Sequence, residues 1–235
     1  MAPQLGIGNS LSAEPVSTLI LRNTYSVSFD GTNDYVDTGF QPNFIHTNAT
    51  MSYWCKLDNV SGNRAIGCHN SKRFYLGISG GTAYFGVANA YKYAVDISSH
   101  IAADTWMHLA VVAEDGTATY YLDGVSRDTF SYTQSASTNP NTNFLIGALS
   151  TSSSPNSYID GLVDEVAIFD SALSASRIKS IYNGGYPQSL ASYNPVGWWR
   201  MGDNDGGTGS TITDQGSGGN NGTLTNGPVF STVTP

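Results

Sequence analysis

The chain has 235 residues, a formal net charge of −8 at pH 7 and a charged fraction of only 12%. Binding to a phosphate backbone is dominated by cationic contacts, so a negative chain without a cluster of lysine or arginine is not expected to bind nucleic acid. No apolar run approaches the roughly 18 residues of a membrane-spanning helix, so no membrane span is expected.

Glycine, serine, threonine and asparagine are abundant, and helical periodicity is almost absent. This composition is typical of many short strands joined by polar turns. At this length a single β-sandwich is favoured over two small domains. We therefore predict an all-β, antiparallel sandwich.

Residues 1–24 have no clear period and contain two prolines and two glycines. We interpret them as an extended N-terminal arm, either disordered or docked onto a partner or identical subunit. They show neither the basic leader nor the compact apolar core of a secretory signal, so no signal peptide is expected in this sequence. Residues 25–235 are then predicted to form a single domain.

The stretch 25–40 is predicted to form a strand, a glycine-containing turn and a second strand. Its turn region holds three carboxylates, Asp30, Asp34 and Asp37, within eight residues and without one basic neighbour. Clustered carboxylates repel one another, and a bound cation would relieve that repulsion. The alternative is that they serve as solvated turn residues.

Several short alternating runs follow and predict a meander of hairpins. They cover residues 51–57, 64–67, 74–79, 83–88 and 91–95. Cys55 and Cys68 fall on two consecutive strands of this meander. Two buried thiols are favoured over an inter-strand disulfide, because two cysteines in a chain of this length are no disulfide framework.

The strongest local signal is Asp115-Gly116, which lies between two runs rich in β-branched and aromatic residues and predicts a two-residue hairpin turn. The predicted register places Glu114 opposite Thr117. It also puts three apolar pairs on one face, namely Ala113/Ala118, Val111/Tyr120 and Leu109/Leu122. The hairpin needs further strands, since an isolated pair is marginal in water.

Further strands are predicted at residues 129–132, 144–148 and 158–169. Alternation in the last of these places Asp164 on an apolar face, where a carboxylate needs a hydrogen-bonding or ionic partner. The apolar residues of that face are Leu162, Val166 and Ile168.

One short helix is predicted at residues 174–182, with Ser174 as its N-cap and Gly184 as its terminator. A linker bracketed by prolines follows. Two final strands are then predicted at residues 196–201 and 228–233.

Four motifs occur in an order that points to a known family. They are FDGTNDYV at 29–36, MSYWCKL at 51–57, the hairpin at 106–124 and IDGLVDEVAIFDSALSASRIKSIYNGG at 159–185. Together they resemble the laminin-G-like jelly rolls of the concanavalin A-like lectin/glucanase superfamily, over residues 25–186. The resemblance implies an antiparallel jelly-roll sandwich.

In that family a segment similar to WWRMGDNDGGTGSTITDQGSGGNNGTLTNGP normally precedes the FDG strand, whereas here it follows everything else. We interpret this order as a circular permutation in which residues 196–233 return beside that strand and close the sandwich. The alternative is the opening of a second, truncated repeat, which would leave Trp198 and Trp199 without a core. Asp203 and Asp205 in this segment are interpreted as solvated turn residues.

The resemblance also implies a structural Ca²⁺ at the rim of the sandwich, between the FDG turn and the late strand. It points to Asp30 and Asp164 as ligands, with Asp34 and Asp160 as weaker additions. Backbone carbonyls and water would complete the roughly 6 to 8 oxygen positions that Ca²⁺ prefers. The alternative is an Asp164 that is bonded only to backbone amides.

The same superfamily contains glucanases, whose retaining reaction needs two carboxyl groups about 5 to 5.5 Å apart. Their E-x-D-x-x-E pattern does not occur here, and Asp164 and Glu165 are expected on opposite faces of a strand. His108 is interpreted as a strand residue bonded to a neighbour such as Asp123. We predict no catalytic residues, with a glycoside hydrolase as a remote alternative.

Glycan binding is the other activity that the resemblance implies. The candidate residues are Tyr91 and Tyr93, with His69 nearby in the sequence, because lectin sites combine aromatic platforms with a few hydrogen-bonding groups. The alternative is that these tyrosines only cover a pleated sheet.

The sequence therefore predicts a non-enzymatic recognition or adhesion module that binds carbohydrate on an extracellular or virion surface. The N-terminal arm and the absence of a signal peptide favour a virion component. The alternative is a purely structural decoration or fibre protein that has no glycan ligand and binds its neighbours through the arm.

Overall fold

The computed structural model describes residues 21–43, 48–70, 73–88, 90–133 and 141–235, without the side chains of residues 91–94. Most of the predicted N-terminal arm, residues 1–20, therefore lies outside the described residues.

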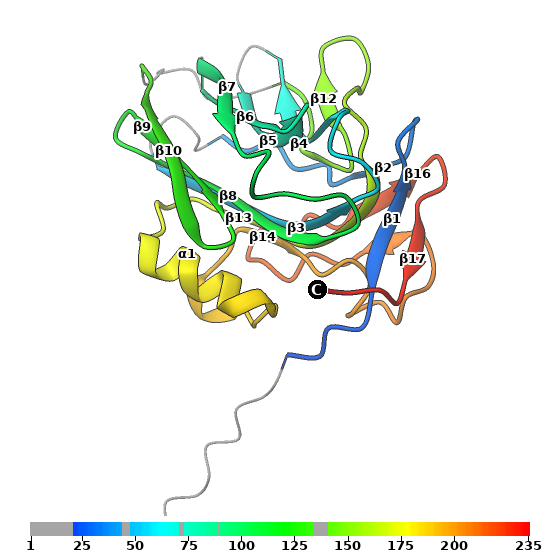
Figure 1. Ribbon diagram of the computed structural model, residues 1–235. Helices are drawn as coiled ribbons and strands as arrows, with labels where there is room; N and C mark the ends of the chain where they lie inside the picture. The colour runs from blue at the N-terminus through cyan, green and yellow to red at the C-terminus, as the bar shows by residue number, and fades with distance from the viewer. Residues whose placement is uncertain (1–20, 44–47, 71–72, 89, 134–140) are drawn as a thin grey trace, which may run out of the picture.

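Two sheets stack face to face and form the body of the protein (Figure 1). Sheet A runs in the order β10 (Val125–Ser131), β9 (Thr117–Leu122), β8 (Trp106–Glu114), β3 (Ala49–Leu57), β13 (Asp160–Phe169), β1 (Ser26–Asp30) and β17 (Val229–Ser231), with β14 (Gly197–Trp199) paired to β13. Sheet B runs in the order β15 (Thr211–Ile212), β16 (Gly222–Thr225), β2 (Tyr35–Asp37), β11 (Leu145–Ile146), β4 (Asn63–His69), β5 (Arg73–Ser79), β6 (Thr82–Ala88) and β7 (Ala90–Asp96), with β12 (Leu149–Thr151) paired to β4. Every named strand pair except β12–β4 is antiparallel, so the predicted sandwich is confirmed.

The β8–β9 hairpin has the predicted register, with Glu114 opposite Thr117 and the three apolar pairs in place. Asp115 and Gly116 adopt positive φ angles of 46° and 82°, as a two-residue turn of the primed type requires. Val111 and Tyr120 face the core between the sheets.

The core fills the space between the inner faces of the two sheets. Met51, Phe85 and Leu109 are fully buried in it. The C-terminal segment contributes Trp199, whose ring stacks on Phe144 with centroids 6.1 Å apart. Apolar burial of this extent is the main force that holds the two layers together.

Strand β13 differs from its predicted alternation. A β-bulge lies between Asp164 and Ala167, and Glu165 adopts a positive φ of 46°. A one-residue insertion exchanges the two faces of a strand, so Val163 faces the core before the bulge and Val166 faces it afterwards. The prediction that Leu162 and Asp164 share a face with Val166 is therefore wrong.

Helix α1 (Ala175–Tyr182) begins after Ser174, whose hydroxyl accepts a hydrogen bond from the backbone N–H of Arg177, as predicted. Its C-cap is Asn183 in the left-handed conformation, one residue before the predicted terminator Gly184. Asparagine tolerates this conformation better than most residues. The helix packs Ile178 and Ile181 against an apolar cluster on the outer face of sheet A.

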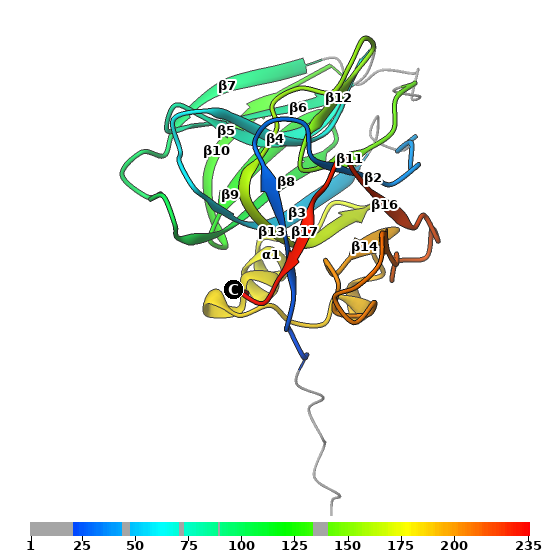
Figure 2. The same ribbon diagram turned by 90° about the vertical axis from the view of Figure 1, so that its right-hand side faces the viewer.

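The C-terminal segment lies beside the first strands of the chain (Figure 2). Strand β17 pairs with β1, where Phe230 lies opposite Val27. Strand β16 pairs with β2, where Leu224 lies opposite Val36. These pairings are the ones that a permuted segment would make.

Candidate functional site

Three of the four predicted calcium ligands gather at one end of the β1–β13 pair. Asp30 lies opposite Asp160 in the ladder. Oδ2 of Asp34 accepts a hydrogen bond from the backbone N–H of Asp30 at 3.3 Å. Hydrogen bonding by the N–H of Thr32 lowers the pKa of Asp30, whereas burial and the charge of Asp30 raise the pKa of Asp34.

The contacts of this rim fit calcium only in part. Oδ2 of Asp160 accepts hydrogen bonds from Nδ2 of Asn59 at 3.0 Å and from the guanidinium of Arg64 at 3.4 Å. Arg64 thus supplies positive charge where a metal ion would otherwise do so. Within the described residues no group of three or more histidine, cysteine, aspartate or glutamate side chains is arranged to hold a metal.

Asp164, the fourth predicted ligand, lies apart from the rim. It is four positions along β13 from Asp160, and it is fully buried. Its carboxylate accepts hydrogen bonds from Nδ2 of Asn23 at 2.9 Å and from the backbone N–H of Glu165 at 2.8 Å. Burial raises its pKa well above the usual value. Asp164 is therefore not placed to share a calcium ion with Asp30.

Asp203 and Asp205 are not solvated turn residues, contrary to the prediction. Oδ1 of Asp203 accepts hydrogen bonds from the backbone N–H groups of Thr24 and Tyr25, at 2.7 and 3.1 Å. Asp205 accepts hydrogen bonds from the backbone N–H and the hydroxyl of Thr213. Asp203 thus connects the C-terminal segment to the residues just before β1, and Asp205 connects two parts of that segment, because backbone amides without a strand partner require acceptors.

The three predicted glycan-binding residues belong to sheet B. His69 ends β4, and its ring meets the edge of Tyr75 at 5.4 Å between centroids. Tyr91 and Tyr93 lie on β7, opposite Gly86 and Tyr84, and their side chains are outside the described part of the structure.

One cross-strand row on sheet B connects this region to a polar pocket. The ladder partners form the row Asp37, Leu145, Gly67, Tyr75, Gly86 and Tyr91. Tyr75 and Tyr84 pack together at 5.8 Å between ring centroids and are only 4% and 2% exposed. A Cβ at Gly86 would come within 2.4 Å of the Tyr75 ring, so this glycine leaves room for the ring. Tyr75 and Tyr84 therefore pack within sheet B, and their rings are too buried for a sugar to stack on them.

The pocket at the other end of the row has a volume of about 290 Å³. We call it the Asp37 pocket. Its lining includes Tyr35, Asp37, Gln41, Asn143, Ser150 and Pro155. Asp37 and Tyr35 come from β2, whereas Asn143 comes from the segment just before β11.

Hydrogen bonds hold the polar groups of the Asp37 pocket in place. Oδ1 of Asp37 accepts from Nδ2 of Asn143 at 2.9 Å and from the backbone N–H of Gly39 at 2.9 Å. Oδ1 of Asn143 in turn accepts from Nε2 of Gln41 at 3.1 Å. Tyr35, which is half-buried, lies two residues before Asp37 in the sequence of β2. A carboxylate, two amides and an aromatic ring are thus preorganised for a polar ligand.

Sequence reasoning found Asp37 only as a turn carboxylate and missed Gln41 and Asn143. No local pattern marks these amides, because 102 residues separate them and only the fold brings them together.

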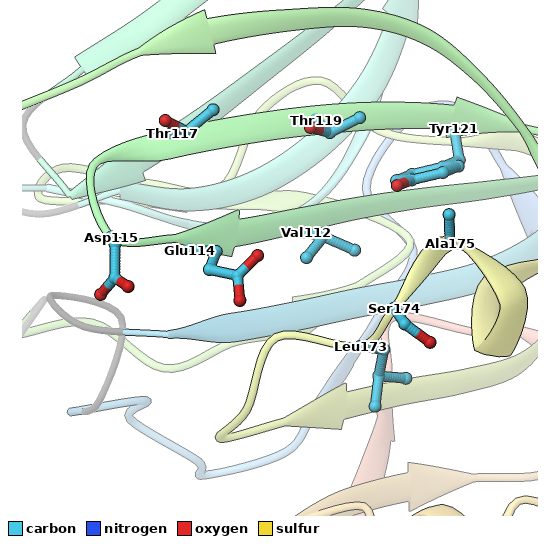
Figure 3. Close-up of a pocket in the computed structure, with 9 residues that line it drawn as sticks. All are labelled: Val112, Glu114, Asp115, Thr117, Thr119, Tyr121, Leu173, Ser174 and Ala175. Carbon is cyan, nitrogen blue, oxygen red and sulfur yellow. The ribbon is translucent and has the colours of Figure 1, made fainter.

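A second hollow of about 450 Å³ lies over the outer face of sheet A, between the β8–β9 hairpin and the start of α1 (Figure 3). Glu114 and Asp115 lie at one end of this groove, and Tyr121 and Ala175 at the other. Tyr121 belongs to the apolar cluster beneath α1. No hydrogen bond within the described residues orients the carboxylate of Glu114. This groove is therefore less organised for recognition than the Asp37 pocket.

None of the helices in the described residues is long and apolar enough to cross a membrane.

Solved structures share the fold at low sequence identity. A Bacteroides ovatus protein, provisionally assigned as carbohydrate-binding, superposes with a TM-score of 0.69 at 18% identity, over 92% of this chain and 61% of its own length. A heptameric SAP-like pentraxin from Limulus polyphemus superposes with a TM-score of 0.53 at 16% identity, over 71% of this chain and 86% of its own. These likenesses show the fold alone.

A search of curated proteins found no match. A family model matches residues 30–179, which is more than half of the 235 residues, and the protein therefore belongs to the concanavalin A-like lectin/glucanases superfamily.

Proposed function

We propose that the protein is a non-enzymatic carbohydrate-binding module and that its ligand enters the Asp37 pocket. The observation that carries the proposal is the hydrogen-bonded set of Asp37, Asn143 and Gln41 beside the ring of Tyr35. Sugars present hydroxyl groups and one apolar ring face. Fixed acceptors and donors next to an aromatic ring match that chemistry.

The comparisons support the proposal through the superfamily, which includes lectins, and through the carbohydrate binding provisionally assigned to the Bacteroides ovatus protein. The arrangement of the two sheet faces also supports it. Helix α1 and the apolar cluster beneath it cover part of the outer face of sheet A, whereas the Asp37 pocket opens on sheet B.

Hydrolysis of a glycan is not favoured at this pocket. Glycoside hydrolysis uses a pair of carboxyl groups that flank the scissile bond. Among the lining residues that the structure describes, Asp37 is the one with a carboxyl group. A single carboxylate can accept a hydrogen bond from a sugar, but it cannot act as both acid and nucleophile.

A glycan array followed by calorimetric titration of the best ligand tests the proposal. We expect binding by the unaltered chain and at least about a fivefold loss in Asn143→Ala, because one well-placed hydrogen bond contributes about 1 kcal/mol or more. The matched control is Glu114→Gln, which removes a carboxylate from the groove over sheet A and should leave the affinity unchanged. The opposite pattern, with affinity lost in the control and kept in Asn143→Ala, would move the site to that groove.

The setting proposed for this module is an extracellular or virion surface, where glycans are displayed. The alternative is a structural decoration or fibre protein that binds identical or partner subunits through the N-terminal arm, residues 1–24. Mass measurement in solution for the full chain and for a chain lacking residues 1–20 separates the two. An oligomer that needs those residues, together with no hit on the array, would favour the structural role.

A further inference from the structure

The lining of the Asp37 pocket also indicates which class of sugar the pocket binds. We infer that it takes one terminal, uncharged sugar residue through two neighbouring hydroxyl groups and disfavours sugars that carry a carboxylate or sulfate. This inference rests on the proposed function and narrows it.

The first argument is the hydrogen-bonding capacity that the network leaves open. Both contacts of the Asp37 carboxylate use Oδ1, and no described residue donates to Oδ2. Nδ2 of Asn143 donates one of its two N–H groups to Asp37, and the second remains available for a ligand. The orientation of the Asn143 amide is determined by its neighbours, because its nitrogen must face the carboxylate and its oxygen faces Nε2 of Gln41.

Oδ2 of Asp37, a free acceptor, therefore lies next to the second N–H of Asn143, a free donor, because the two side chains are hydrogen-bonded to each other. Two vicinal hydroxyl groups match this pair, because one can donate to Asp37 Oδ2 while the oxygen of the other accepts from Asn143 Nδ2. Tyr35 supplies an apolar surface for the ring carbons of the same sugar.

The second argument is charge. Among the described residues that line the pocket, Asp37 is the one with a charged side chain, and none is lysine, arginine or histidine. The guanidinium of Arg64 is committed elsewhere, to Asp160 and to the backbone carbonyl of Tyr158. A carboxylate or sulfate placed here would lie beside Asp37 without a counter-charge. Like charges at close range disfavour binding strongly.

The third argument is size. A volume of about 290 Å³ lies near the lower end of the roughly 300–1,000 Å³ that ligand pockets usually span. A pocket of this size accommodates one sugar ring, and the remainder of a longer glycan would extend into solvent.

The test compares methyl glycosides that share one ring and differ only at C6, namely a neutral hexoside with a hydroxymethyl group and the corresponding uronide with a carboxylate, by calorimetric titration at low ionic strength. The hexoside is the best neutral hit of the array. We expect the uronide to bind at least about tenfold more weakly. Lengthening the neutral ligand beyond the terminal residue should change its affinity by less than about threefold.

Asp37→Asn is the key variant because it keeps an oxygen that can accept from Gly39 and Asn143 while it replaces the open acceptor. We expect it to weaken binding of the hexoside by about tenfold or more and to reduce the preference over the uronide to within about threefold. Gln41→Arg adds a guanidinium at the exposed mouth of the pocket in place of the amide that bonds Asn143, and it should improve binding of the uronide relative to the hexoside. Far-ultraviolet circular dichroism and a melting curve check that each variant folds.

The outcomes separate this inference from the proposed function. Equal or tighter binding of the uronide, lost in Asn143→Ala, would overturn the charge selectivity while leaving the carbohydrate site in place. Binding that requires several consecutive sugars would overturn the single-residue claim. An array without any hit, or binding unaffected by every pocket variant, would overturn both.

Discussion

Nε of Arg200 donates a hydrogen bond to Oε1 of Glu165 over 2.9 Å, and this ion pair is buried between the C-terminal segment and the bulge of β13. Nε1 of Trp198 donates to the other oxygen of the same carboxylate at 2.6 Å. The guanidinium also donates to Asp203 at 3.0 Å. Burial raises the pKa of Glu165 to about 7, although Arg200 acts in the opposite direction.

Removal of Arg200 should destabilise the protein strongly. In Arg200→Met the carboxylates of Glu165 and Asp203 lose their buried cation, and breaking one side of a buried pair costs about 3–5 kcal/mol. Urea unfolding followed by tryptophan fluorescence gives the change in the free energy of unfolding.

The double variant Glu165→Gln, Arg200→Met supplies the control, because the neutral amide no longer needs a counter-charge. It should recover part of the loss. A single variant within about 0.5 kcal/mol of the unaltered chain would show that the ion pair does not hold the C-terminal segment.

His108 should make the protein less stable in acid. Its ring is fully buried, lies 5.2 Å from the ring of Trp54 between centroids, and has neither nitrogen bonded within the described residues. Asp123 is the partner of His108, as predicted, but its carboxylate accepts a hydrogen bond from the backbone N–H of His108 and not from the ring. Burial lowers the pKa of His108 from 6.5 to about 3.

The direction of the pH effect follows from that lowered pKa. Between about pH 6.5 and pH 3 the unfolded chain binds a proton on His108 that the folded chain does not, so this residue's contribution falls as the pH is lowered, by up to about 1.4 kcal/mol per pH unit. Unfolding measurements from pH 7 to pH 4.5 should show a smaller slope in His108→Phe than in the unaltered chain. Substitution of the exposed His100 by glutamine should leave the slope unchanged, and identical slopes for all three proteins would refute the assignment.

Calcium binding at the rim stays a prediction, now restricted to Asp30 and Asp34 with backbone and water oxygens. If it is correct, free calcium at about 100 times its dissociation constant stabilises the fold by about 2.7 kcal/mol. Melting curves in calcium and in chelator should then differ for the unaltered chain and coincide for the double variant Asp30→Asn, Asp34→Asn. Coincident curves for both proteins would leave Arg64 as the group that neutralises the rim.

Both cysteines are free and buried, as predicted, and they should react only after unfolding. Burial raises the pKa of Cys68 to about 12 and raises that of Cys55 still further. The thiolate is the reactive form, so a chromogenic disulfide reagent at pH 8 should label essentially no thiol in the native protein. In denaturant it should label two, and rapid labelling of the native protein would indicate local opening of β3 or β4.

Local sequence patterns were sufficient for most of the strands, the hairpin and the helix, but not for the short strands β12, β15 and β16. Asp115-Gly116 specified its turn because it can adopt positive φ between two strand-forming runs. Ser174 specified the start of α1 because its hydroxyl reaches the N–H of Arg177. Both signals act within a few residues, so they can be recognised without the rest of the chain.

The predicted faces of β13 were wrong because one extra residue exchanged the two faces of the strand. The bulge at Glu165 placed Asp164 and Val166 on opposite faces of β13, and nothing in the alternation of the strand indicates it. Asp164 is separate from Asp30 because the β1–β13 register pairs Asp30 with Asp160, four positions away. Asp203 is not the solvated turn residue that the sequence predicts, because it accepts hydrogen bonds from the two backbone N–H groups just before the first strand. Such acceptors depend on which backbone amides the fold leaves unpaired.

The sequence by itself determined the class of fold, because strand propensity, turn chemistry and apolar alternation are local properties that agreed along the chain. Only the tertiary structure decided which polar groups share a site. Asp37 and Asn143 are 106 residues apart and meet because β2 and β11 pair in sheet B. A hydrogen bond between residues so distant in the chain depends on the register of several strands at once, and no short stretch of sequence encodes that register.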